Sequence, residues 1–191
     1  MNTPAHLIFG LTVFGRNQNP RVTAAAFFGA LVPDLSLYLM AGWSLFIAQI
    51  PPDVVFGQMY FSDAWQNVFA IDNSIPLWAL AVGLATLLRA PVAFAFAGAG
   101  LLHLLFDFPL HHDDARRHFW PLTDWVFHSP VSYWDPSHFG NITSVIEVGV
   151  CVVFSVVLLR YFKSGLTRGL ILLLACVEVA PPLMFHLMFG H

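Results

Sequence analysis

Four residues with metal-binding side chains recur at helical spacing in the middle of the chain. His103, Asp107 and His111 follow one another every four residues, and Asp114 comes three residues later, so a helix would carry them on one stripe. They follow the apolar segment 91–102, where ionisable groups are costly unless they bind a ligand or pair with one another. Imidazole and carboxylate groups suit Zn²⁺ or a similar divalent ion. The alternative is a polar helix end whose histidines and aspartates only pair.

The composition predicts an integral membrane protein with one domain, residues 1–191. The chain is 58% hydrophobic and 10% charged, whereas soluble domains carry about 25% charged residues. The net charge of −3 is too small and dispersed to favour a nucleic-acid partner. Both cysteines lie in apolar segments, so no disulfide framework is implied, and no removed signal peptide is expected.

The pattern of apolar segments predicts an all-α helix bundle with about five transmembrane helices. The segment 5–14 is too short to span a bilayer and is expected to be partly inserted. The expected spans are 22–50, 74–88, 92–110, 142–159 and 170–189. Because proline disfavours helix at the residue before it, we expect a break or kink near Val32. Polar, aromatic connections are expected at 53–73 and 111–141.

The basic residues predict which way the bundle faces. Arg116 and Arg117 fall on one side of the five-span arrangement, and the other six fall on the opposite side: Arg16, Arg21, Arg89, Arg160, Lys163 and Arg168. By the positive-inside rule the side with six is cytoplasmic. The acidic and aromatic loops then face outward, which is the periplasm in a bacterial inner membrane.

Helical rise predicts that ionisable residues from separate spans share one depth. His103 lies roughly 21 Å beyond Arg89, and Asp34 and Glu147 each lie roughly 20 Å from the basic end of their own segments. His6 and Glu178 fall in the same layer, in the outer half of the bilayer. We therefore expect side chains from separate spans to converge, with Glu147 as a general acid or base. The alternative for Glu147 is an acid that only favours a helix N-terminus.

Three short motifs carry a resemblance to a known family. They are Thr3-Pro-Ala-His6, Pro33-Asp34 and His103-Leu-Leu-Phe-Asp107. In order and spacing they resemble the LexA-binding, inner-membrane-associated hydrolases, also called membrane-bound metal-dependent hydrolases. The resemblance covers about the first 125 residues. The ligand order alone is also similar to that of zinc-dependent phospholipase C and the P1-type nucleases, which implies clustered zinc ions acting on phosphodiesters.

One part of the family pattern is missing. The family carries His-Arg and then Thr-His-Ser before its third apolar segment, and here only Ser74 matches, with Asn73 at the histidine position. At least one expected ligand is therefore absent. Either other acidic and imidazole groups compensate, or the activity has been lost. The groups able to compensate are Asp72, His111, His112, Asp113 and Asp114.

These observations predict a membrane-embedded, metal-dependent hydrolase that acts on a phosphoester or related bond of a lipid or lipid-linked substrate. The expected metal is Zn²⁺, held by His6, Asp34, His103, Asp107 and His111. Glu147 and Asp114 are the expected catalytic groups. Arg116 and Arg117 are expected to bind lipid phosphate, or else to pair with Asp113 and Asp114.

Two other functions remain open from the sequence. One is a haem-binding membrane subunit that uses His103 and His186. The other is a non-catalytic accessory membrane protein descended from a hydrolase, which the missing motif favours.

Overall fold

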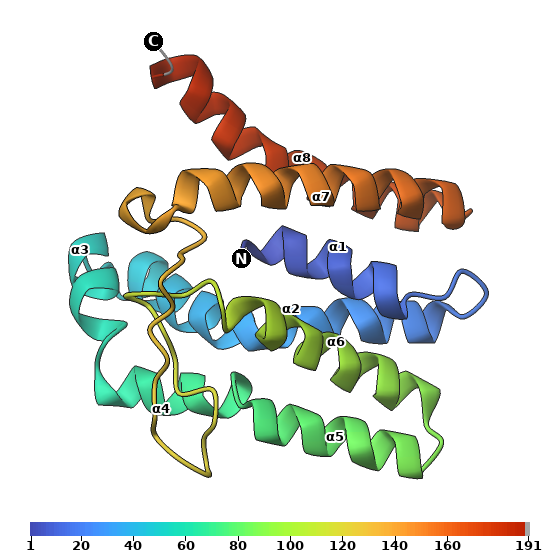
Figure 1. Ribbon diagram of the computed structural model, residues 1–191, viewed down its shortest axis with the longest axis horizontal. Coiled ribbons are helices and arrows are strands. Elements are labelled where there is room, and N and C mark those ends of the chain that lie inside the picture. The colour runs from blue at the N-terminus through green and yellow to red at the C-terminus, as the bar shows by residue number, and fades with distance from the viewer. Residues whose placement is uncertain (190–191) are drawn as a thin grey trace.

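A computed structural model describes the backbone of residues 1–189 and the side chains of residues 1–180. This part of the chain is all-helical, which confirms the predicted fold class (Figure 1). The main helices are α1 (Thr3–Phe14), α2 (Pro20–Gly42), α4 (Asp63–Asp72), α5 (Ile75–Leu87), α6 (Pro91–Asp107), α7 (Gly140–Tyr161) and α8 (Gly165–Phe189). Single turns lie between them: η1 (Trp43–Ile47), α3 (Pro52–Val54), η2 (Val55–Met59) and η3 (Pro136–His138).

Proline marks the start of most of the long helices. Pro4, Pro20, Pro76 and Pro91 each lie in the first turn of a helix. The missing N–H of proline is harmless there, because the first N–H groups of a helix have no partner within it. These prolines explain why the expected boundaries of α2, α5 and α6 fall within a few residues of the observed ones.

The short helix α1 is enclosed by the rest of the bundle. It contacts α2, α6, α7 and α8, and in Figure 1 it lies between α7 on one side and α2 and α6 on the other. Every residue from Ala5 to Leu11 is buried. A helix that is apolar on all sides is stable in such a position. The N-terminal segment therefore reaches the centre of the molecule.

The described residues contain three helical stretches long and apolar enough to cross a membrane. They are Pro20–Ile47, Asp63–Leu87 and Gly140–Tyr161, and the helices Thr3–Phe14 and Pro91–Asp107 are apolar but shorter. This is the architecture of a membrane protein. The number of five spans stays a prediction. The segment expected to be a loop, 53–73, differs from expectation, because α4 forms there and joins α5 in one of the three stretches.

Of the break or kink expected near Val32, the break is wrong, and the kink stays a prediction. α2 runs without interruption from Pro20 to Gly42, with Pro33 inside it. Side chains from elsewhere donate to the carbonyl groups of this turn: His103 Nδ1 to Ala30 O at 2.7 Å, and Asn73 Nδ2 to Pro33 O at 3.1 Å. These bonds connect this turn of α2 to α6 and to the connection after α4. Asp34 is therefore presented from a continuous helix.

Six of the eight basic residues lie in, or within one helical turn of, connections at one end of the bundle. In Figure 1 the α1–α2, α5–α6 and α7–α8 connections are all at the right-hand end. The long connection between α6 and α7 runs over the opposite part of the molecule. This separation of charge is the one that the sequence predicts.

Close contact between α2 and α6 depends on Gly29. A Cβ atom at this position would lie 2.0 Å from the carbonyl oxygen of Phe96, and backbone atoms cannot yield to it easily. We expect Gly29→Ala to lower the free energy of unfolding by about 1–3 kcal/mol. Thermal unfolding in detergent measures this. Gly83→Ala is the matched control, since nothing lies within 4 Å of a Cβ there. Equal stability of both variants would contradict the prediction.

Candidate metal centre

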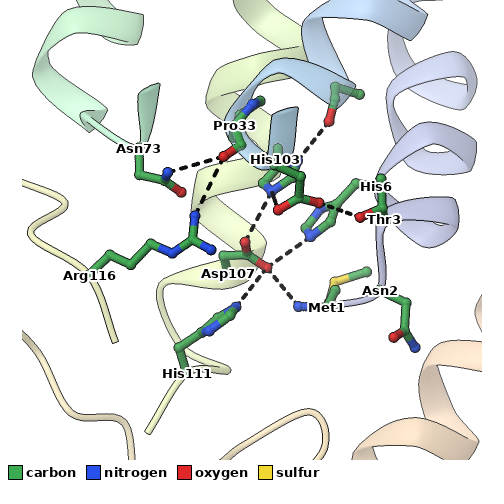
Figure 2. A network of polar contacts seen from close by, with 12 residues as sticks. Met1, Asn2, Thr3, His6, Pro33, Asn73, His103, Asp107, His111 and Arg116 are labelled. Atoms are coloured by element: carbon green, nitrogen blue, oxygen red, sulfur yellow. Dashed lines mark hydrogen bonds and ion pairs between the residues drawn. The ribbon is translucent and has the colours of Figure 1, made fainter. Parts of the chain in front are cut away.

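Three helices bring histidine and aspartate side chains together in the core. His6 comes from α1, and His103 and Asp107 come from α6 (Figure 2). Asp34 comes from α2. The two imidazoles contact opposite oxygens of one carboxylate: His6 Nε2 lies 2.8 Å from Asp107 Oδ1, and His103 Nε2 lies 3.0 Å from Asp107 Oδ2. Asp34 Oδ1 lies 3.7 Å from His103 Nε2. The expected convergence of separate helices is therefore present.

Hydrogen bonds behind the cluster orient its side chains. The Nδ1–H of His103 donates to Ala30 O, which turns Nε2 toward the two carboxylates. Thr3 Oγ1 donates to Asp34 Oδ2 at 2.5 Å and contacts Tyr38 Oη at 2.7 Å. Protein metal sites commonly use such supporting bonds to hold a ligand in one orientation. Sequence reasoning did not assign Thr3 this role, although Thr3 opens the family-like motif.

The donor set fits a divalent cation. One ligand atom each from His6, His103 and Asp107 lies within 4.8 Å of the others, and these residues are 2%, 1% and 4% exposed. Two imidazole nitrogens and a carboxylate are ligands typical of zinc. The His6 and His103 rings stack at 3.5 Å between centroids, so their Nε2 atoms face Asp107 side by side. The amino group of Met1 contacts the same carboxylate at 2.7 Å.

The stripe predicted beyond Asp107 is not helical. α6 ends at Asp107, because Pro109 disfavours helix at the residue before it. The turn that follows still brings His111 back: its Nε2 lies 3.4 Å from Asp107 Oδ1, and its Nδ1 lies 2.9 Å from Asp114 Oδ2. These are ion-pair distances without aligned hydrogen bonds. The predicted grouping of residues is present, but a turn creates it.

Ion pairing favours the charged forms of the His111 and Asp114 side chains. Burial works against a charged imidazole, but the carboxylates of Asp107 and Asp114 outweigh it and raise the pKa of His111. Burial likewise works against a charged Asp114, and His111 outweighs it and lowers the pKa of that carboxyl. The two side chains therefore stabilise one another in their charged forms.

The other groups able to replace a missing ligand lie away from the cluster. His112 Nδ1 donates to Ser129 O, and its ring stacks on His138. The Asp113 side chain is 66% exposed. The Asp72 carboxyl accepts a hydrogen bond from Asn73 Nδ2 at 2.8 Å. Of the groups considered, only His111 and Asp114 reach the cluster.

A cavity of about 520 Å³ opens beside the cluster. Its polar wall includes Thr3, Asp34, His111, Asp114 and Arg116. Its remaining wall is mainly apolar and aromatic: Leu37, Tyr38, Phe56, Tyr60, Phe61, Tyr133 and Trp134. A few convergent polar groups within an aromatic wall are typical of a binding site for a small molecule or cofactor.

The two adjacent arginines differ in their surroundings. Arg116 is buried, with its guanidinium 4.7 Å from the Phe69 ring and Nη1 donating to Pro33 O at 3.5 Å. Within the described residues it makes no ion pair. Arg117 pairs with Asp124 at 3.2 Å, near the surface. The alternative pairing with Asp113 and Asp114 is therefore wrong for both arginines.

Glu147 does not line the cavity. It is 5% exposed, and Oε1 accepts a hydrogen bond from the backbone N–H of Asn2 at 2.7 Å. Glu178 is 2% exposed and accepts one from Asn2 Nδ2 at 3.3 Å. Both glutamates lie behind Asn2, which itself lines the cavity. The side chain of His186, considered as a haem ligand, lies outside the described residues.

Asn73 and His118 form a structural contact that sequence reasoning missed. Asn73 is fully buried, and its carbonyl accepts a hydrogen bond from His118 Nδ1–H at 3.0 Å. His118 falls within the segment 111–141, which the sequence predicts to be a polar connection. Its burial, 3% exposed, follows from tertiary packing alone.

The buried His118 predicts a loss of stability in acid. Burial lowers the pKa of His118 from 6.5 to about 4, against the opposing effect of the Asn73 carbonyl. Between these values the unfolded chain binds a proton that the folded chain does not, so stability falls as pH falls, by about 1.4 kcal/mol per unit at most. We expect His118→Gln to reduce this slope in thermal unfolding measured from neutral to acidic pH. An unchanged slope would show that other groups dominate.

Comparisons with protein families, with curated proteins and with solved structures found no match to this chain.

Proposed function

We propose that this protein is a membrane-embedded, metal-dependent hydrolase acting on a phosphoester or related bond of a lipid or lipid-linked substrate. The observation that carries the proposal is the meeting of His6, His103 and Asp107 donor atoms within 4.8 Å. Asp34 Oδ1 lies 3.7 Å from His103 Nε2, and His111 Nε2 lies 3.4 Å from Asp107 Oδ1. Both would join the set around a bound cation, with His111 in its neutral form. The resemblance to the LexA-binding membrane hydrolases supports the same activity.

Residues that line the cavity supply the other groups that hydrolysis needs. A bound Zn²⁺ would supply a water acidic enough to act as a nucleophile near neutral pH. Asp114 lies on the cavity wall beside His111 and is placed to accept a proton there. The Arg116 guanidinium lies on the same wall, and its fork matches phosphate oxygens. The aromatic residues at the cavity suit the apolar part of a lipid.

The location of the cavity fits a substrate that stays in the bilayer. It is lined by residues of the first turn of α1, the middle of α2 and the α6–α7 connection. The connections rich in basic residues lie at the other end of the bundle. By the positive-inside rule we place that basic end in the cytoplasm and the cavity toward the periplasmic side of a bacterial inner membrane.

Metal analysis of protein purified without chelator tests the proposal. We expect about one equivalent or more of a divalent transition metal, chiefly zinc. Chelation should abolish hydrolysis of short-chain lipid phosphates in mixed micelles, and added Zn²⁺ should restore it. Less than about a tenth of an equivalent of any transition metal would end the proposal.

A non-catalytic accessory role is the second candidate. It is favoured by Asn73, which stands where the family carries histidine and donates to Pro33 O. The Asn73 side chain therefore has a structural role at that position. The double variant Asp34→Ala/His103→Ala separates the two functions. If metal content and cellular phenotype survive both changes, the accessory role is correct.

A further inference from the structure

Two buried glutamates from different helices meet at one residue of α1. Glu147 of α7 and Glu178 of α8 are 5% and 2% exposed. Each gives one oxygen to Asn2, at 2.7 Å and 3.3 Å. The second oxygen of each carboxyl is buried and has no donor among the described residues. The two carboxyl groups therefore share one neighbour, Asn2.

No cationic side chain of residues 1–180 forms an ion pair with either glutamate. The titratable groups facing them are few. Cys151 lies one turn further along α7 and is buried, and a thiol brings no charge. On the α1 side, the Met1 amino group and His6 are both engaged with Asp107 of α6. Among residues 1–180, the pair therefore has no ion-pair partner of its own.

Two ionised carboxylates in this position would be unstable. Like charges that share a buried site oppose one another's ionisation, and burial of an uncompensated charge is costly. An ionised carboxylate is also only an acceptor of hydrogen bonds. A buried pair of carboxyl groups with unpartnered oxygens on one shared neighbour is therefore most stable when it holds one proton.

We propose that Glu147 and Glu178 form a buried proton-binding site in which the two carboxyl groups share one proton, and that this acid pair holds Asn2 in place. Asn2 is followed by Thr3, whose hydroxyl orients Asp34, and both residues line the cavity. The glutamates themselves do not line it. They are positioning residues that act through the start of α1. The proposal goes beyond the hydrolase function and does not depend on a bound metal.

Infrared spectroscopy of the full-length protein in lipid nanodiscs tests the shared proton directly. At neutral pH the wild-type protein should show the carbonyl band of a protonated carboxylic acid. Glu147→Gln and Glu178→Gln should each remove it, because the glutamine amide then donates to the one remaining, ionised glutamate. Asp113→Asn, which changes an exposed carboxylate, should leave the band unchanged. The proposal fails if the wild type lacks the band, or if the band survives in both glutamine variants.

The pH dependence of unfolding gives a second, independent measurement. The folded chain holds a proton that the unfolded chain releases at an ordinary glutamate pKa, so the wild type should lose stability as pH rises. One such proton changes the folding equilibrium constant by about tenfold per pH unit at most. Glu178→Gln should flatten this dependence and keep the fold, whereas Glu178→Ala should lower stability at every pH. Stabilisation by added Na⁺, K⁺ or Mg²⁺, with no carboxylic acid band, would show a cation in place of the proton and overturn the proposal.

Discussion

Replacing Asp107 by asparagine is expected to remove the bound metal and the hydrolytic activity. Asp107 contacts His6 at 2.8 Å, His103 at 3.0 Å and His111 at 3.4 Å, so it is the carboxylate common to the whole cluster. Asparagine keeps its shape but loses the charge and one acceptor oxygen. Because even supporting groups change metal affinity by 10- to 100-fold, we expect a loss of at least about 100-fold. Metal analysis after dialysis against a competing chelator measures this.

Asp113→Asn is the matched control for this substitution. Asp113 carries the same chemical group six residues away, but its side chain is 66% exposed, and its one ion pair among residues 1–180 is with His112, at 3.5 Å. Asp113 lines the outer part of the cavity but does not contact the cluster. A surface pair of this kind contributes little, so metal content should stay within about twofold of the wild type. Adding chelator should lower the unfolding temperature of the wild type and of Asp113→Asn, because a ligand that binds only the folded state stabilises it. If Asp107→Asn keeps its metal, the cluster is a buried polar network without a metal function.

Replacing Arg116 by lysine is expected to lower kcat/KM for a lipid phosphate by about 100- to 1000-fold, the range measured when one donor to a transition-state anion is lost. The Arg116 guanidinium lies against the Phe69 ring and faces the cavity. Lysine keeps the positive charge but cannot present a planar fork to two phosphate oxygens. Metal content should not change, which distinguishes this variant from Asp107→Asn. Initial rates with short-chain lipid phosphates measure the effect.

Arg117→Lys controls for the loss of an arginine at the neighbouring position. Arg117 pairs with Asp124, whose side chain is 76% exposed, so the interaction is largely screened by water. We expect rates within about twofold of the wild type. If Arg117→Lys lowers the rate and Arg116→Lys does not, the substrate binds at the loop surface and not in the cavity.

Several features of this protein follow from the sequence by itself. An apolar composition with few charges can be stable only as a membrane bundle, and prolines in the first turn of a helix mark where α2, α5 and α6 begin. Spacing of four residues within α6 places His103 beside Asp107, because a helix brings such positions onto one face. Depth along each span indicated that Asp34 and Glu147 lie in the same layer.

Only the tertiary structure decided which residues of that layer contact the metal-binding cluster. Depth alone does not determine which faces of the helices meet, so Asp34 contacts the cluster while Glu147 contacts Asn2. Pro33 lies inside an unbroken α2, and donors from α6 and from the connection after α4 bind carbonyl groups of the same turn. Such donors are distant in sequence, and no local pattern indicates them.

Long-range packing also explains where α6 ends and why the two adjacent arginines differ in burial. Local pattern indicates a continued helical stripe after Asp107, but the chain turns at Pro109, and the long connection packs back over the bundle. That connection buries Arg116 and His118 and leaves Arg117 near the surface. The sequence determined which histidine and aspartate residues could form a metal site, because their spacing involves positions only a few residues apart. The long-range packing of an irregular connection decided which of them face the cavity, because burial depends on contacts between segments far apart in the chain.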